Sequence, residues 1–244
     1  MEQRDRDFFR QHGYLDLGKV LSDAEVARFV ELYDRDRSEC AYLWRPLGAH
    51  QTINCEALMS WPEIDEIIRH PKIVAPMQEL MGGPLTFEEV CVRHMGPYEG
   101  EVSRSFHRDR PHWDEHALRL DYIQAMVYLS DVNADTHCFS LSPESIDEEV
   151  LDKEQQIERG GIFDFHGAAG SVAIFNISVL HTATVRPTQQ ERKTIQTYYG
   201  HPERSFLSND STIPARLWRD AEDEVVRAFY GKLNPKSELF ARAF

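Results

Sequence analysis

The sequence has few cysteines and no long hydrophobic run, and each absence excludes a class of protein. Its four cysteines, at 40, 55, 91 and 138, are widely spaced and form no C-x-x-C motif, so neither a zinc site nor a disulfide framework is indicated. We expect four reduced thiols. No segment approaches the roughly 20 apolar residues of a membrane-spanning helix, and the first residues lack the apolar core of a secretory signal. The sequence therefore predicts a soluble, cytoplasmic protein.

Basic residues are also scarce. The chain has 27 Lys and Arg against 41 Asp and Glu, a formal net charge of −14 at pH 7. Such a chain is repelled by phosphate backbones and anionic lipid, so we expect no nucleic-acid partner and no membrane partner. A small-molecule substrate is the expected partner, and nothing in the sequence indicates an oligomeric state. Because 41% of the 244 residues are hydrophobic, one large core is possible, and we expect a single domain over residues 1–244.

Hydrophobic periodicity divides this domain into three parts. Residues 1–84 are predicted to be mostly helical support, since Ser22 and Glu25 can form a capping box and Gly82-Gly83-Pro84 ends a helical pattern. Residues 85–200 contain β-branched and aromatic runs typical of strands. The predicted strands are 86–95, 118–129, 171–177 and 193–199, with a charged helical or mobile excursion over 146–159. A closing helix over 214–230 is predicted in the C-terminal segment 201–244.

Alternation along two of these strands assigns side chains to opposite faces. One face of the second strand is apolar and should pack on a core: Ile123, Ala125, Val127 and Leu129. The other face is mixed, as suits the inside of a barrel: Tyr122, Gln124, Met126 and Tyr128. In the last strand, Arg192 begins a polar series that continues at Thr194, Gln196 and Tyr198. Polar side chains inside a barrel need ligands or water as partners.

Two H-x-D motifs lie five residues apart, His107-Arg108-Asp109 and His112-Trp113-Asp114. The motif is short enough to arise by chance, and the spacing alone does not choose between the two. Together with a distal histidine, His181, either motif offers two imidazoles and one carboxylate. That set can hold one face of a ferrous ion and leave the opposite face open for substrate chemistry. Arg192 follows the distal histidine by eleven residues.

The order of these features resembles the phytanoyl-CoA dioxygenase family of iron(II)/2-oxoglutarate oxygenases over nearly the whole chain. The block Phe106-His107-Arg108-Asp109, with Trp113 six residues after the first histidine, is similar to the family's H-x-D block and selects His107/Asp109 over His112/Asp114. Further similar segments are Phe9 to Val30, Met81-Gly82-Gly83, Leu129-Ser130-Asp131, Ser142-Pro143 and Gly170 to Phe175.

The resemblance implies a mainly β fold: a double-stranded β-helix, or cupin-like jelly roll, with N-terminal helices and a C-terminal helix. It implies that His107, Asp109 and His181 are the catalytic Fe(II) ligands and that Arg192 pairs with the distal carboxylate of the cosubstrate 2-oxoglutarate. With dioxygen, such an enzyme oxidises a small organic molecule, here by expected hydroxylation, and releases succinate and carbon dioxide. The other candidates for the cofactor site are Gln124, Tyr122 and Trp113.

Some positions depart from the family's pattern. Thr136-His137 stands where the family has Asn-Gly, Pro143-Glu144-Ser145-Ile146 replaces its Pro-Gly-Ser-His turn, and Ala183 stands where some members have a hydroxyl. Arg186 competes with Arg192 for the cosubstrate, but it precedes Pro187, which suggests a turn. Two other functions stay open: a cupin-like metal enzyme or lyase that does not use 2-oxoglutarate, and a non-catalytic metal- or ligand-binding barrel. Release of succinate discriminates among the three.

Overall fold

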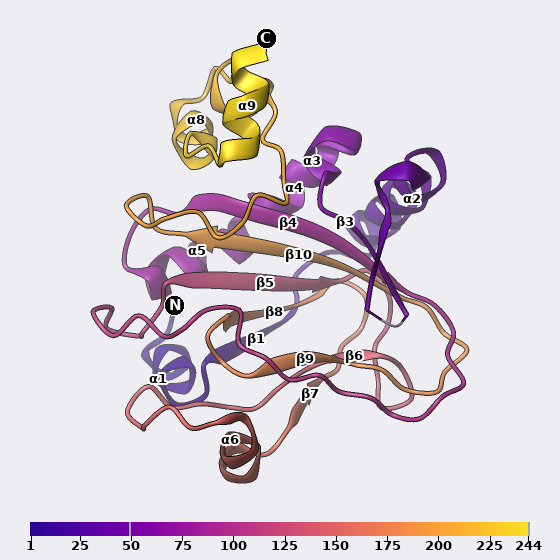
Figure 1. The fold of residues 1–244 in the computed structure, drawn as a ribbon, viewed down its shortest axis with the longest axis vertical. Helices are drawn as coiled ribbons and strands as arrows, with labels where there is room; N and C mark the ends of the chain where they lie inside the picture. The colour runs from indigo at the N-terminus through magenta and orange to yellow at the C-terminus, as the bar shows by residue number, and fades with distance from the viewer. Residues whose placement is uncertain (49, 244) are drawn as a thin grey trace.

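The structure is a computed structural model that describes residues 1–48 and 50–243, and two antiparallel sheets form its centre (Figure 1). The larger sheet has the strand order β1-β8-β5-β10-β4-β3-β2. Its strands are β1 (Tyr14–Lys19), β2 (Arg45–Leu47), β3 (Gln51–Asn54), β4 (Thr86–Met95), β5 (Tyr122–Tyr128), β8 (Ser171–Asn176) and β10 (Arg192–Gly200). The smaller sheet has the order β7-β6-β9, from Phe163–Phe165, Cys138–Leu141 and His181–Thr184. This is the predicted jelly-roll architecture.

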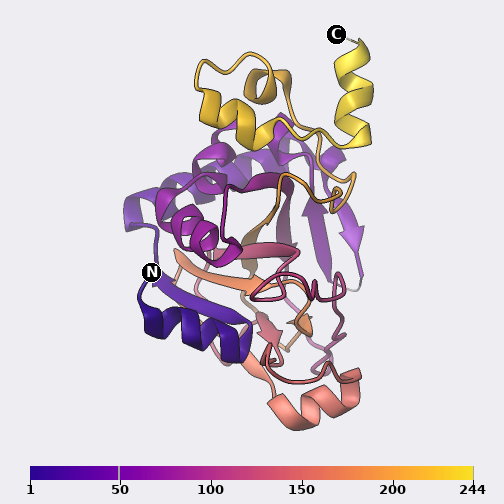
Figure 2. The ribbon, with the colours of Figure 1, turned by 90° about the vertical axis from the view of Figure 1, so that its left-hand side faces the viewer.

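Helices flank the larger sheet and lie at both ends of the molecule. They are α1 (Gln3–His12), α2 (Asp23–Glu39), α3 (Ala57–Ser60), α4 (Asp65–Ile68), α5 (Pro71–Met81), α6 (Lys153–Gly160), α7 (Ala215–Trp218), α8 (Glu224–Tyr230) and α9 (Pro235–Ala243), with short 3-10 helices at Ala41–Leu43 and Pro62–Ile64. Figure 2 shows α6 at the opposite end of the molecule from the C-terminal helices. The capping box of Ser22 and Glu25 is present at the start of α2, and α5 ends at Gly82, whose φ of 73° is left-handed.

The two faces of β5 pack in two different hydrophobic clusters. The apolar face of β5 packs with the helices in the larger cluster, which includes Ile123, Ala125 and Val127. The opposite face of β5 belongs to the second cluster, where Tyr122, Met126 and Tyr128 lie among residues of the smaller sheet such as Phe139 and Phe165. Both predicted faces of this strand are confirmed. The interior between the two sheets therefore receives one face of β5.

Three details differ from the sequence prediction. The first 84 residues include β1, β2 and β3, and β1 pairs with β8 at the edge of the larger sheet. The predicted strand 118–129 begins only at Tyr122, because the backbone N–H groups of Leu118 and Leu120 donate to Nδ1 of His116 and form a loop. The predicted helix 214–230 is divided into α7 and α8, since the Asp223 side chain caps a new helix start, and α9 follows.

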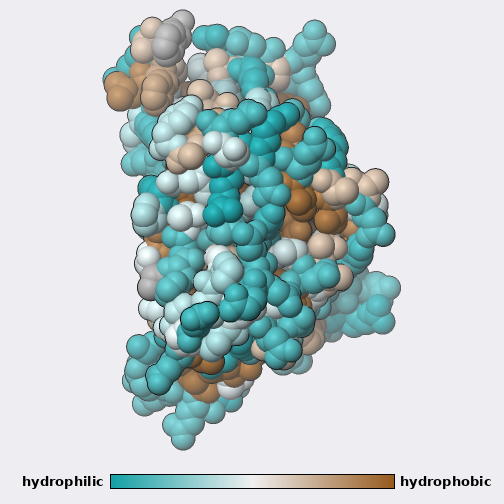
Figure 3. Space-filling model, turned by 90° about the vertical axis from the view of Figure 1, so that its right-hand side faces the viewer, coloured by the Kyte–Doolittle hydropathy of each residue, from teal (hydrophilic) through white to brown (hydrophobic). Residues whose placement is uncertain are grey.

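The surface on the side drawn in Figure 3 is mostly hydrophilic, with small hydrophobic areas among charged and polar residues. Among residues 1–48 and 50–243, no helix combines the length and apolar character needed to cross a bilayer.

Candidate metal centre

Three side chains from two segments converge between the sheets. Nε2 of His107 lies 3.3 Å from Oδ1 of Asp109, and Nε2 of His181 lies 3.6 Å from Oδ2 of the same carboxylate. One donor atom from each residue lies within 4.8 Å of the other two. Two imidazole nitrogens and one carboxylate oxygen thus surround a single point, which is the donor set that a divalent transition metal such as Fe(II) takes.

Backbone pairing explains why the two imidazoles face the same point. The backbone N–H of His107 donates to the carbonyl of His181, and that of His181 donates to the carbonyl of His107, each at 3.0 Å. A second bridge joins Ser103 to Val185, so the segment 103–107 runs antiparallel beside β9. Residues directly opposite one another in antiparallel strands project their side chains to one face. The pairing therefore sets both histidines on the same side.

Hydrogen bonds at the far side of each ring leave the inner nitrogen available. Nδ1 of His107 lies 3.0 Å from the carbonyl oxygen of Ser105, and Nδ1 of His181 lies 2.8 Å from that of Val179. A carbonyl oxygen only accepts, so each Nδ1 carries a proton, and Nε2 of each ring is the nitrogen that faces the centre. This arrangement orients a histidine ligand before a metal binds.

Asp109 is held by its backbone and by the two rings. Its N–H donates to the carbonyl of Ile177 at 3.1 Å. Burial by itself would raise the pKa of the Asp109 carboxyl, but hydrogen bonds and charge from His107 and His181 lower it well below its usual range. The carboxylate is consequently ionised at neutral pH, as a metal ligand must be.

Arg192 lies at the start of β10 and is an unpaired buried cation. Its side chain is 1% exposed, and Nε, Nη1 and Nη2 have no hydrogen-bond partner among the described residues. Burial lowers the pKa of this guanidinium. Unpaired buried donors of this kind are costly, so they indicate an anionic ligand. Arg192 lines a pocket together with His107, Asp109, His181 and Gln124. These residues fit a metal ion with an adjacent dicarboxylate.

The competing residues are engaged elsewhere. Arg186 pairs with Asp164 and donates to the carbonyl of Thr136, so its guanidinium already has acceptors. Asp114 has a largely exposed side chain and pairs with Arg119 at 3.2 Å. The second H-x-D motif therefore does not converge with His181.

Two predicted site residues lie outside the cavity, which corrects the expectation that they line it. Tyr122 has the predicted orientation but lies at the far end of β5, where its hydroxyl donates to the carbonyl of Ser205 at 2.6 Å. Trp113 is not among the residues that line the cavity, and the guanidinium of Arg204 lies over its ring, with Cζ 4.4 Å from the ring centroid. The loop after the H-x-D motif directs Trp113 toward the C-terminal segment, which a motif alone does not show.

Glu144 connects the two segments that carry the converging residues, and the sequence reasoning missed it. Its carboxylate accepts from the N–H of Leu180, which precedes His181, at 2.7 Å. It also accepts from Nη2 of Arg108, which lies between His107 and Asp109, at 2.8 and 2.9 Å. Burial would raise the pKa of Glu144, but hydrogen bonds from His112, Arg108 and Leu180 lower it overall. The departure from the Pro-Gly-Ser-His turn was the signal for this contact.

Comparison with known proteins places the chain in a family. The model of phytanoyl-CoA dioxygenase (PhyH) matches residues 9–194, and the chain belongs to this family of Fe(II)- and 2-oxoglutarate-dependent oxygenases. No curated protein matches.

Solved structures share the fold at low identity. The non-heme alpha ketoglutarate dependent carbocyclase SnoK from nogalamycin biosynthesis is 19% identical over 82% of this chain and 84% of its own, with a TM-score of 0.69. HygX from Streptomyces hygroscopicus, with nickel, 2-oxoglutarate and hygromycin B bound, is 18% identical over 84% and 89%, with a TM-score of 0.63. EctD from S. alaskensis with bound Fe is 16% identical over 93% and 86%, with a TM-score of 0.71. At these identities the likeness shows the fold.

Proposed function

We propose that the chain acts as a single-domain oxygenase that hydroxylates a small organic molecule at an iron(II) centre, with 2-oxoglutarate as cosubstrate and dioxygen as oxidant. One observation carries the proposal: the three converging donors and the unpaired Arg192 line the same cavity. A metal site alone would leave Arg192 without a partner, and an anion site alone would not need the donor set. Membership of the PhyH family supports the same function.

The residues have separate tasks in this proposal. His107, Asp109 and His181 would hold the iron, and Arg192 would pair with the distal carboxylate of 2-oxoglutarate through two parallel N–H donors. Iron and 2-oxoglutarate together supply the oxidising chemistry, with succinate and carbon dioxide as coproducts. Gln124 lines the cavity, and its buried side-chain oxygen has no partner in the described part of the chain; it would bind water or the cosubstrate there. The protein otherwise orients the reactants.

Hydroxylation is the outcome that needs the fewest further assumptions. The three donors include a carboxylate, Asp109, which would occupy a coordination position on the metal. A halide would need that position to be free of a protein ligand. Structures of the same fold include a carbocyclase, SnoK, which shows that product analysis has to accompany any assay of cosubstrate turnover.

The decisive experiment measures succinate formed by purified protein with Fe(II), 2-oxoglutarate and dioxygen, first alone and then with a panel of small molecules. We expect slow uncoupled release that a true substrate stimulates, and loss of release in His181→Ala. Binding of 2-oxoglutarate to the metal-loaded protein is followed in parallel. Metal binding without 2-oxoglutarate binding would favour a cupin-like enzyme of another kind, and binding of both without turnover of any candidate would favour a non-catalytic barrel.

A further inference from the structure

A groove outside the metal centre contains a basic side chain and no acidic one. It shares His107 with the metal centre and is walled by Gln51, Ser103, Ser105 and Thr182, with Leu47 and Val185 as apolar parts. None of the residues that line it is Asp or Glu, although the chain has 41 acidic and 27 basic residues. The groove is therefore basic, although the protein as a whole is acidic. It also offers hydroxyl and amide groups for hydrogen bonding.

Arg93 lies on the boundary between this groove and the metal cavity and lines both. It belongs to β4, directly opposite Thr194 of β10 and Ile53 of β3. Thr194 belongs to the interior face that begins at Arg192, so Arg93 shares that face. The side chain of Arg93 makes one hydrogen bond among the described residues, from Nε to Sγ of Cys91 at 3.4 Å. No carboxylate of those residues lies within ion-pair distance, and Nη1 and Nη2 have no acceptor.

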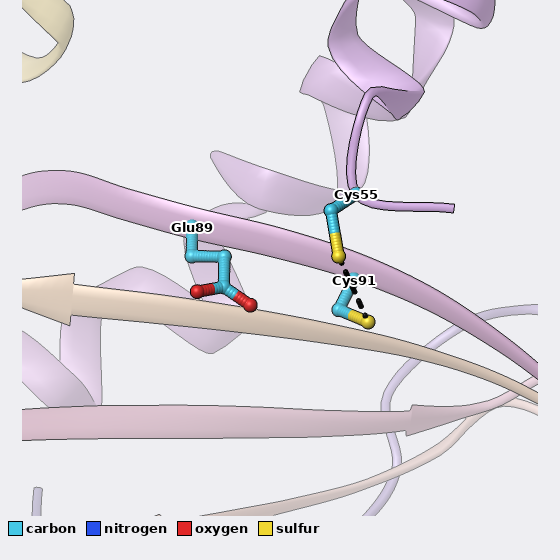
Figure 4. A group of neighbouring side chains, drawn as sticks. All are labelled: Cys55, Glu89 and Cys91. Atoms are coloured by element: carbon cyan, nitrogen blue, oxygen red, sulfur yellow. Dashed lines mark hydrogen bonds between the residues drawn. The ribbon is translucent and has the colours of Figure 1, made fainter. Parts of the chain in front are cut away.

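Two buried thiols, Cys55 and Cys91, lie beside Nε of Arg93 and orient its guanidinium. Figure 4 shows Cys55 and Cys91 directed toward one another from neighbouring segments, with Glu89 farther along β4. Cys55 donates to Cys91 over 3.4 Å, so Cys91 receives donors from both Cys55 and Arg93. The bond from Cys55 lowers the pKa of the Cys91 thiol despite burial, which favours a partial negative charge beside Nε. The edge formed by Nη1 and Nη2 is left for a ligand.

We propose that the primary substrate carries an anionic group, a carboxylate or a phosphate, which Arg93 binds in this groove beside the metal centre. The proposal rests on the oxygenase function proposed above and names the substrate class. A planar guanidinium with two free nitrogens matches two oxygens of either anion. The hydroxyl groups of Ser103 and Ser105 can supply further hydrogen bonds to it. Arg93 would thereby determine specificity and fix the substrate next to His107.

The cosubstrate is the competing occupant of Arg93, and the two arginines differ in a way that separates their roles. Arg192 is buried, and none of its three nitrogens has a hydrogen-bond partner among the described residues. Arg93 is partly exposed to the groove, and one nitrogen is already bonded. We therefore assign the distal carboxylate of 2-oxoglutarate to Arg192 and a second anion to Arg93.

Calorimetric titration of the Ni(II)-loaded protein with saturating 2-oxoglutarate tests this assignment. The probes are hexanoate, hexyl phosphate and the uncharged hexanamide, which share one alkyl chain. In the wild type we expect at least one anionic probe to bind about tenfold or more tightly than hexanamide. The anion that binds more tightly indicates whether the substrate's group is a carboxylate or a phosphate. Arg93→Met should abolish the preference while 2-oxoglutarate affinity changes by less than about threefold. Arg104→Met is the matched control, since Arg104 is already bonded to Thr184, and it should keep the preference.

Three outcomes would overturn the proposal: no preference for either anion in the wild type, an unchanged preference in Arg93→Met, or a loss of 2-oxoglutarate binding in Arg93→Met. The last would assign Arg93 to the cosubstrate. Failure of the oxygenase function gives a different result, because the wild type would then bind Ni(II) without 2-oxoglutarate, or would bind both and form no succinate with any candidate. The anion preference is measured on the metal-free protein in that case.

Discussion

Replacement of Arg192 by methionine should change stability and ligand binding in opposite directions. Arg192 is 1% exposed, and none of its side-chain nitrogens has a partner in residues 1–48 and 50–243, so the protein without ligand carries an uncompensated desolvation penalty. Methionine has a similar length and no charge. We expect Arg192→Met without ligand to be as stable as the wild type or more stable, by about 1 to 3 kcal/mol, as when other buried charges are replaced by apolar side chains.

Binding of 2-oxoglutarate should fall at the same time. Removing one partner from a buried charged pair costs about 3 to 5 kcal/mol, which corresponds to a loss of roughly two to three and a half orders of magnitude in affinity. A ligand at a hundred times its Kd stabilises the folded state by about 2.7 kcal/mol. The wild type should show this stabilisation, and the variant should show almost none at the same ligand concentration.

Urea unfolding of the metal-loaded proteins, with and without 2-oxoglutarate, measures both effects, and direct titration gives the affinities. Arg186→Met is the control, because Arg186 already pairs with Asp164; it should lose stability and keep 2-oxoglutarate binding. A variant at position 192 that binds 2-oxoglutarate within threefold of the wild type would refute the assignment of the cosubstrate carboxylate. A large loss of stability without ligand would refute the claim that the buried charge is unpaired.

Three further predictions follow from named contacts. His107→Ala and His181→Ala should each abolish stoichiometric Fe(II) binding in a metal titration, whereas His112→Ala should retain it; the reverse result would mean that the other H-x-D motif is the site. Glu144→Gln should weaken Fe(II) binding by about tenfold or more, because Glu144 joins Arg108 to Leu180, and an unchanged Kd with a lowered Tm would make its role purely structural. Burial raises the pKa of Glu89 to about 7. Between about pH 4.5 and 7 the folded state therefore binds more protons than the unfolded state. The free energy of unfolding should fall as pH rises through that window, by up to about 3 kcal/mol. Urea unfolding at pH 5 and pH 8 should show this fall in the wild type and not in Glu89→Gln, and an equal fall in both would exclude Glu89 as its source.

The strand faces could be predicted where one face meets apolar helices and the other meets the interior. Ile123 and Gln124 illustrate this, since each lies on the predicted side of β5. Arg93 could not be found in this way, because almost every residue of β4 is buried on both faces and alternation carries little signal there. Its position follows from the register with Thr194 of β10, which depends on long-range pairing.

The N-terminal strands escaped prediction for a related reason. β2 and β3 are only three and four residues long, too short for a period-2 pattern. They are defined by pairing instead, since β3 pairs with β4 and β2 pairs with β3. Glu144 lies in a segment that the sequence predicts to be a turn, and only the folded chain shows that its carboxylate meets Arg108. The order of motifs along the chain was enough to predict His107, Asp109 and His181 as the converging residues. The contacts that hold these residues in place depend on long-range packing, which the sequence alone does not show.

The topology of the larger sheet also has a kinetic consequence. Tyr14 pairs with Phe175, and Met95 pairs with Arg192, so neighbouring strands come from distant parts of the chain. Closing such long loops costs entropy before the contacts form, and proteins with this pattern fold slowly. The bridge between His107 and His181 requires the same long-range assembly, so the metal centre is completed late. We therefore expect bound metal to slow unfolding while leaving the folding rate nearly unchanged.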